Sequence, residues 1–62
     1  MTHLEAIEIM KSGGNVRHRY FRPDEYMFMI HGKMFNNSGE DVNDFFEFHN
    51  TEGWLKDWSI VE

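Results

Sequence analysis

The chain has no cysteine, and proline occurs only once in its 62 residues. Without thiols, neither a disulfide nor a thiolate zinc site can stabilise the fold. No apolar run approaches the roughly 18 residues that a membrane-spanning helix needs, and no secretory leader pattern is present. We therefore expect a soluble cytoplasmic protein with a single domain over residues 1–62 and no membrane association.

Positive charge is also scarce, because six Lys and Arg residues stand against eleven Asp and Glu, for a net charge of −5. Residues 38–62 hold seven carboxylates and one cation, Lys56. General nucleic-acid binding needs clustered cations against phosphates, so the composition argues against that class. The remaining cations gather at Arg17, Arg19 and Arg22, which still allows a small phosphate-bearing ligand.

Aromatic side chains are abundant by contrast, with ten Phe, Tyr and Trp residues. A domain this small buries only about 60% of its unfolded surface. Each aromatic side chain buries roughly 150–250 Å², so we expect these rings to form the core and part of a subunit contact. The continuous apolar run 26–30 suits a strand covered on both faces, by a helix and by a partner chain. We therefore expect a homodimer or tetramer.

The first fourteen residues predict an amphipathic helix. Thr2 and Glu5 form a capping box, in which each side chain satisfies a free backbone N–H. Gly13 and Gly14 end the helix, because glycine accepts the left-handed conformation found there. The apolar residues expected on one side are Leu4, Ala6, Ile7, Ile9 and Met10.

The rest of the chain reads as strands and turns. We expect a strand over 15–21, a hairpin over 26–35 around Gly32, a turn over 36–41 and a final strand over 57–61 with Trp58 and Ile60 facing inward. Segment 42–50 fits helix or strand, and its aromatic and Asn/Asp content favours strand. Thr51 is expected to cap one helical turn over 52–56. The predicted fold is α+β: one N-terminal amphipathic helix packed on a small, mainly antiparallel sheet of about four strands.

Catalytic and metal-binding motifs are missing. The sequence shows no Ser-His-Asp or Cys-His arrangement and no Gly-rich phosphate loop with its lysine. The four histidines lack the i, i+4 spacing of a helical metal site. We predict no catalytic residue, no metal and no cofactor, and we expect surface or half-buried histidines: His3, His18, His31 and His49.

The one concentrated basic and aromatic stretch is the candidate ligand site, formed by Arg17, Arg19, Tyr20 and Phe21. Guanidinium groups bind phosphate through paired hydrogen bonds, and aromatic faces stack on bases. The alternative is a strand whose arginines pair with carboxylates of the carboxy-terminal half. The residues alone leave both interpretations open.

Three segments together, "LEAIEIMKSGGNVRHRYF", "EYMFMIHGKMF" and "WLKDWSIVE", resemble the small phage proteins of the Thoeris anti-defence two family. Glu5-Ala6 opens the shared pattern, Gly13-Gly14 makes its turn, Val16-Arg17 follows, and Asp57-Trp58 closes it. Phe21 stands where the family has a tryptophan, and His18 where a second arginine is common. The chain is also shorter than family members between the hairpin and the closing turn.

The resemblance implies an α+β homo-oligomer that acts in the host cytoplasm. Such proteins bind cyclic ADP-ribose-type signals or cyclic oligonucleotides and hold them without cleavage. By this resemblance Arg17 and Arg19 would contact phosphate, Tyr20 and Phe21 would stack on a base, and Trp58 would lie in the core. The alternative is an acidic phage inhibitor that binds a host protein directly. Its contact residues would be Glu40, Asp41, Asp44, Glu47 and Glu52.

Overall fold

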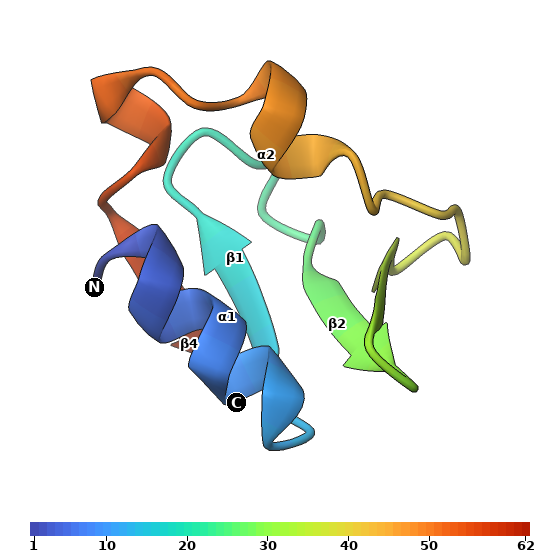
Figure 1. Ribbon diagram of the computed structural model, residues 1–62. Helices are drawn as coiled ribbons and strands as arrows, with labels where there is room; N and C mark the ends of the chain where they lie inside the picture. Colours follow the sequence, from blue (N-terminus) through green and yellow to red (C-terminus); the bar gives the residue numbers. More distant parts are fainter.

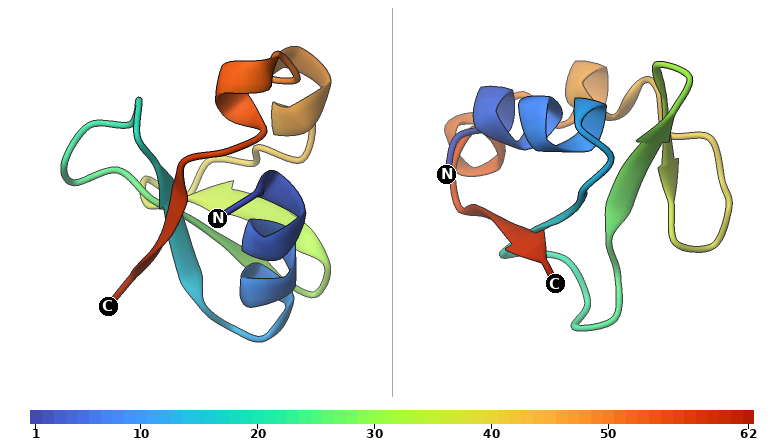
Figure 2. Two further views of the ribbon diagram at one scale, coloured as in Figure 1. Left: turned by 90° about the vertical axis from the view of Figure 1, so that its left-hand side faces the viewer. Right: turned by 90° about the horizontal axis from the view of Figure 1, so that it is seen from below.

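The computed structural model describes residues 1–62 and has two layers, helices over a sheet (Figures 1 and 2). The elements in order are α1 (His3–Lys11), β1 (Asn15–His18), β2 (Met27–Ile30), β3 (Lys33–Asn36), α2 (Phe45–Phe48), the 3-10 turn η1 (Glu52–Trp54) and β4 (Trp58–Val61). The strands form one antiparallel sheet in the order β3-β2-β1-β4. The predicted α+β fold is therefore confirmed. No helix is long and apolar enough to span a membrane.

Helix α1 begins at the predicted capping box. The Thr2 backbone N–H donates to Glu5 Oε1 over 2.9 Å, and the Glu5 N–H donates to Thr2 Oγ1 over 3.2 Å. The hydrogen bond from the Thr2 backbone, helped by the one with its side chain, lowers the pKa of the Glu5 carboxyl below its ordinary value. Gly13 has φ of +92° and ends the helix as expected. Leu4 is a correction, because it is 63% exposed while Ala6 and Met10 are buried.

Strand β1 is shorter than the predicted 15–21. It ends at His18, whose carbonyl accepts the Phe21 N–H over 3.0 Å and so closes a turn. The chain then crosses to β2 through the loop that contains Pro23. The β2–β3 hairpin is confirmed, and its two connecting residues, His31 and Gly32, both have positive φ, as a type I′ turn requires.

Segment 42–50 is the main correction, because it forms α2 and not a strand. The chain first runs back along β3, where Val42 donates its N–H to the Met34 carbonyl over 2.9 Å. Phe45 and Phe46 then turn towards the core, and this packing holds a single helical turn that local propensity would not form alone. The next turn, η1, follows Thr51 as expected but ends at Trp54, and the Thr51 side chain makes no capping hydrogen bond.

The core lies between α1, the sheet and α2. Its buried apolar members are Ala6, Met10, Val16, Phe21, Met27, Met34 and Trp58. Trp58 is 2% exposed and its Nε1–H donates to the Trp54 carbonyl over 2.8 Å, so its predicted core role is confirmed. Ile60 pairs with Val16 on the same side of the sheet, yet it is 49% exposed because β4 is an edge strand. Its expected inward position is therefore only partly correct.

The opposite side of the sheet carries no helix, since α1, α2 and η1 all lie on one side (Figure 2). Side chains alternate between the two sides of the sheet along each strand. Val16 and His18 face the core, so the residues next to them in β1 point to the opposite side. We call this side the bare face. It comprises Asn15, Arg17, Phe28, Ile30, Lys33, Phe35, Ser59 and Val61. Within one chain, the run 26–30 is thus covered on one face and open on the other.

Candidate functional site

Arg17 points out from the bare face and runs along the loop that follows β1. Its Nη2 donates to the Arg22 carbonyl over 3.2 Å and to the Phe21 carbonyl over 3.5 Å. Its Nε is buried and has no hydrogen-bond partner. Part of this guanidinium therefore fixes the loop, and the rest remains unpaired.

Arg19 lies beyond the end of β1 and is largely free. Its Nη1 is 3.7 Å from Asp57 Oδ2, and the two side chains are 71% and 40% exposed. An exposed ion pair of this kind contributes little, so Arg19 can leave Asp57 for another anion. The alternative prediction, in which the arginines pair with carboxylates of the carboxy-terminal half, therefore holds for Arg19 alone, and the contact is loose.

The two predicted stacking rings occupy different environments. Tyr20 is 60% exposed and its ring lies edge-on against Trp54, with centroids 5.2 Å apart. Phe21 is only 9% exposed and contacts Phe45 and Trp58 edge-to-face inside the core. In this conformation Tyr20 alone offers a free aromatic surface to a ligand.

Gly53 allows the Tyr20 ring to approach the backbone of η1 closely. A Cβ at position 53 would lie 3.3 Å from the Tyr20 hydroxyl oxygen, tighter than most such contacts. The absence of a side chain there lets the ring pack over the η1 backbone. Tyr20 is consequently held in place from one side while its other side faces solvent.

His18 is a buried polar residue that organises this region. Its Nε2 lies 2.7 Å from the Gly53 carbonyl oxygen and 2.8 Å from the Lys56 carbonyl oxygen, and the Tyr20 N–H donates to its Nδ1 over 3.0 Å. These partners assign the tautomer that carries the proton on Nε2. The burial of His18 is a correction, because the sequence predicted a surface or half-buried histidine and His18 is 0% exposed. Its alternation with Val16 along β1 was the signal for burial.

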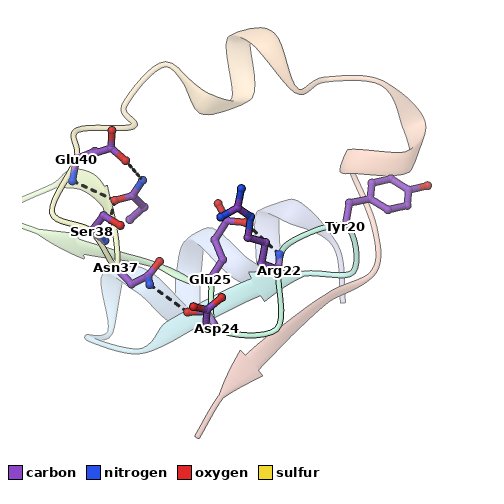
Figure 3. Close-up of a pocket in the computed structure, with 8 residues that line it drawn as sticks. Tyr20, Arg22, Asp24, Glu25, Asn37, Ser38 and Glu40 are labelled. Atoms are coloured by element: carbon purple, nitrogen blue, oxygen red, sulfur yellow. Dashed lines mark hydrogen bonds between the residues drawn. The ribbon is translucent and has the colours of Figure 1, made fainter.

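The largest cavity adjoins this segment and has a volume of about 520 Å³. We call it the polar groove. Its lining residues are Tyr20, Arg22, Asp24, Glu25, Asn36, Asn37, Ser38 and Glu40. Figure 3 shows Tyr20 at one end with its ring directed away from the other lining residues, Ser38 and Glu40 at the other end, and Arg22 with Glu25 between them.

Hydrogen bonds fix both walls of the polar groove. Asn37 Nδ2 donates to the Asp24 carbonyl over 3.0 Å, and Asn36 Nδ2 donates to Glu40 Oε1 over 2.9 Å. On the other wall the Arg22 N–H donates to Glu25 Oε1 over 3.1 Å. The 36–41 turn was predicted as a turn alone, and nothing in its composition indicated that it faces the loop after β1.

Negative charges outnumber positive charges along the polar groove, which is lined by three carboxylates and one guanidinium. Arg22 is its only cation and can bind a phosphate oxygen, whereas the carboxylates accept hydrogen bonds from hydroxyl or amino groups. Of the four predicted site residues only Tyr20 lines the groove. Arg17, Arg19 and Phe21 do not, so the structure does not gather the four in one cavity.

A second cavity of about 350 Å³ lies at the carboxy-terminal end of α1. It is lined by Met10, Lys11, Gly13, Met29, His31 and Gly32, none of them a predicted site residue. No three side chains of the metal-binding types come together anywhere in the chain. His49 stacks on Phe45 at 4.0 Å, His3 contacts Phe46, and His31 is exposed at the hairpin turn.

Comparison with protein-family models, curated proteins and solved structures finds no match for this chain.

Proposed function

We propose that this protein binds and sequesters a cyclic nucleotide immune signal, of the cyclic ADP-ribose type or a cyclic oligonucleotide, without cleaving it. Such a phage anti-defence protein would act in the host cytoplasm by lowering the free signal concentration. Three segments of the sequence support this through their resemblance to the Thoeris anti-defence two family. The lining of the cavity is polar, with one aromatic residue, Tyr20, and one cation, Arg22.

The observation that carries the proposal is the polar groove beside Tyr20 and Arg22. Its volume of about 520 Å³ lies within the range of roughly 300–1,000 Å³ typical of small-molecule sites. Arg22 offers a phosphate contact, and Asp24 and Glu25 offer acceptors for ribose hydroxyls. The exposed Tyr20 ring lies at one end of the groove and points away from it (Figure 3), so it would stack on a base only after turning towards the groove. Arg19, one residue before Tyr20 and three before Arg22, supplies a second, exposed cation.

Isothermal titration against cyclic ADP-ribose isomers and cyclic dinucleotides tests this function. We expect saturable binding by the wild type and at least 10-fold weaker binding by Arg22→Gln, since a charge-assisted hydrogen bond contributes about 1.5–3 kcal/mol. Tyr20→Leu is expected to weaken binding by a similar factor through lost stacking. Lys56→Gln, an exposed cation outside the groove, is the control. No heat with any ligand at high protein concentration would contradict the proposal.

A homo-oligomer is part of this proposal. Only 8 of 62 residues are buried in the single chain, which favours added burial between copies. The open edge of β4, where Ile60 is 49% exposed, is a surface through which two sheets can pair. Light scattering at tens of micromolar protein is expected to give a dimer or tetramer mass, and a monomer mass would contradict this part.

A second candidate function is direct inhibition of a host protein. Three of the eleven carboxylates pair with a cation, which leaves eight without one. On α2, Phe48 is 75% exposed beside Glu47, so an apolar side chain projects from an acidic surface. A stoichiometric host protein that is retained from lysate and survives nucleotide addition would favour this function over the first.

A further inference from the structure

The bare face holds an aromatic group that is separate from the core. Phe28 and Phe35 are cross-strand partners whose rings stack at 6.1 Å with an interplanar angle of 27°. Tyr26 adds a third ring, 6.2 Å from Phe28. These rings are half-buried and contact no core ring, and Ile30 beside them is 50% exposed. The sheet therefore presents apolar surface that nothing in the chain covers.

The charges on the bare face are all positive. Its strand positions include Arg17 and Lys33 and no carboxylate, although acidic residues outnumber basic ones in the chain. Neither Arg17 nor Lys33 forms an ion pair with a carboxylate of the chain. The surface thus combines apolar rings with two uncompensated cations and is complementary to an apolar, acidic partner.

Other occupants fit less well. A second copy packed face to face would bring Arg17 and Lys33 of both chains together without a carboxylate between them, which is unfavourable. A small ligand needs a concave site, and neither cavity lies on this face. A nucleic-acid strand needs a cluster of cations against its phosphates, and this face has only Arg17 and Lys33.

We propose that the bare face docks an acidic amphipathic helix of a partner protein. The helix would add a third layer, with its apolar stripe over Phe28 and Phe35 and its carboxylates towards Arg17 and Lys33. Four short strands present about 250 Å² in projection, so the contact is small and the affinity modest. None of these residues lines the polar groove, so this docking stands independently of nucleotide binding.

The test uses the ¹⁵N-labelled protein and a designed 18-residue helical peptide with a leucine stripe flanked by glutamates. We expect saturable shifts of the amides of Phe28, Lys33 and Phe35, with a dissociation constant on the order of 10–100 μM. A matched peptide with lysine in place of each glutamate is expected to bind at least 10-fold more weakly.

Variants locate the contact. Lys33→Glu is expected to weaken binding of the acidic peptide at least 5-fold, since Lys33 is exposed and its replacement leaves the fold intact. Lys11→Glu makes the same charge change on α1, on the covered side of the sheet, and is expected to leave binding unchanged. Equal binding of both peptides, shifts confined to the polar groove, absence of shifts, or a preference for an oligonucleotide on this face would each overturn the proposal.

Discussion

At the scale of single residues, His18 combines two roles that an apolar side chain cannot combine. It fills a fully buried position in β1 and at the same time satisfies the Gly53 and Lys56 carbonyls and the Tyr20 N–H. Buried backbone groups without partners are costly. One imidazole therefore connects the end of β1 to the η1 region and positions Tyr20.

Replacing His18 by alanine tests this role. His18→Ala leaves a cavity and three backbone groups without their partner, whereas Val16→Ala, at an equally buried position of the same strand, leaves only a cavity. We expect His18→Ala to lower the free energy of unfolding by about 1–3 kcal/mol more than Val16→Ala. Urea denaturation measures the difference, and equal losses would show that the hydrogen bonds contribute nothing net.

At the scale of secondary structure elements, α1 depends on its first turn. Thr2→Ala removes one capping acceptor and is expected to cost about 1 kcal/mol of stability in urea denaturation.

The Glu5 carboxylate makes the stability of α1 depend on pH. Because the folded-state pKa of Glu5 lies below its ordinary value, the contribution of this carboxylate to stability is present at neutral pH and is lost as the pH falls below about 4.

Glu5→Gln is the matched control for that pH dependence. A glutamine side chain also accepts the Thr2 N–H but does not titrate. We expect the stability of Glu5→Gln to fall less steeply than that of the wild type between about pH 5 and 3. Parallel pH profiles for the two proteins would contradict the capping role of the carboxylate.

Helix α2 offers a second contrast between neighbouring residues. Phe45 packs edge-to-face on Phe21 and Trp54, whereas Phe48 is 75% exposed. We expect Phe45→Ala to destabilise the fold by about 3 kcal/mol and Phe48→Ala by less than about 0.5 kcal/mol. Thermal or urea unfolding measures both, and a large loss for Phe48→Ala would mean that this ring is buried in solution.

The same elements show which features could be read from sequence. The capping box at Thr2, the turn at Gly32 and the β4 segment depend on local chemistry, and all were predicted. The helix at α2 was missed because its stability comes from rings that pack into a distant core, which local propensity does not report. Phe21 was expected at a ligand, but β1 ends early and the following turn directs this ring inward.

At the scale of the whole molecule, the loops after β1 and after β3 together form the polar groove. They are separated in the sequence by the β2–β3 hairpin, and Asn37 bridges them through hydrogen bonds with the Tyr26 N–H and the Asp24 carbonyl. The sequence singled out the basic residues of the first loop but predicted residues 19–21 of that loop as part of a strand over 15–21, and it gave no sign of the opposite wall. The polar groove is thus a tertiary feature, and the proposed nucleotide site depends on it more than on any single motif.

The most direct test of the proposed function is an ¹H–¹⁵N spectrum of the protein titrated with cyclic ADP-ribose isomers and cyclic dinucleotides, followed by mass analysis of the recovered ligand. We predict saturable shifts of amides in 19–25 and 36–40 with at least one ligand, which is recovered at unchanged mass. Spectra that stay unchanged across the whole panel, or a ligand recovered as a cleaved product, would contradict the account.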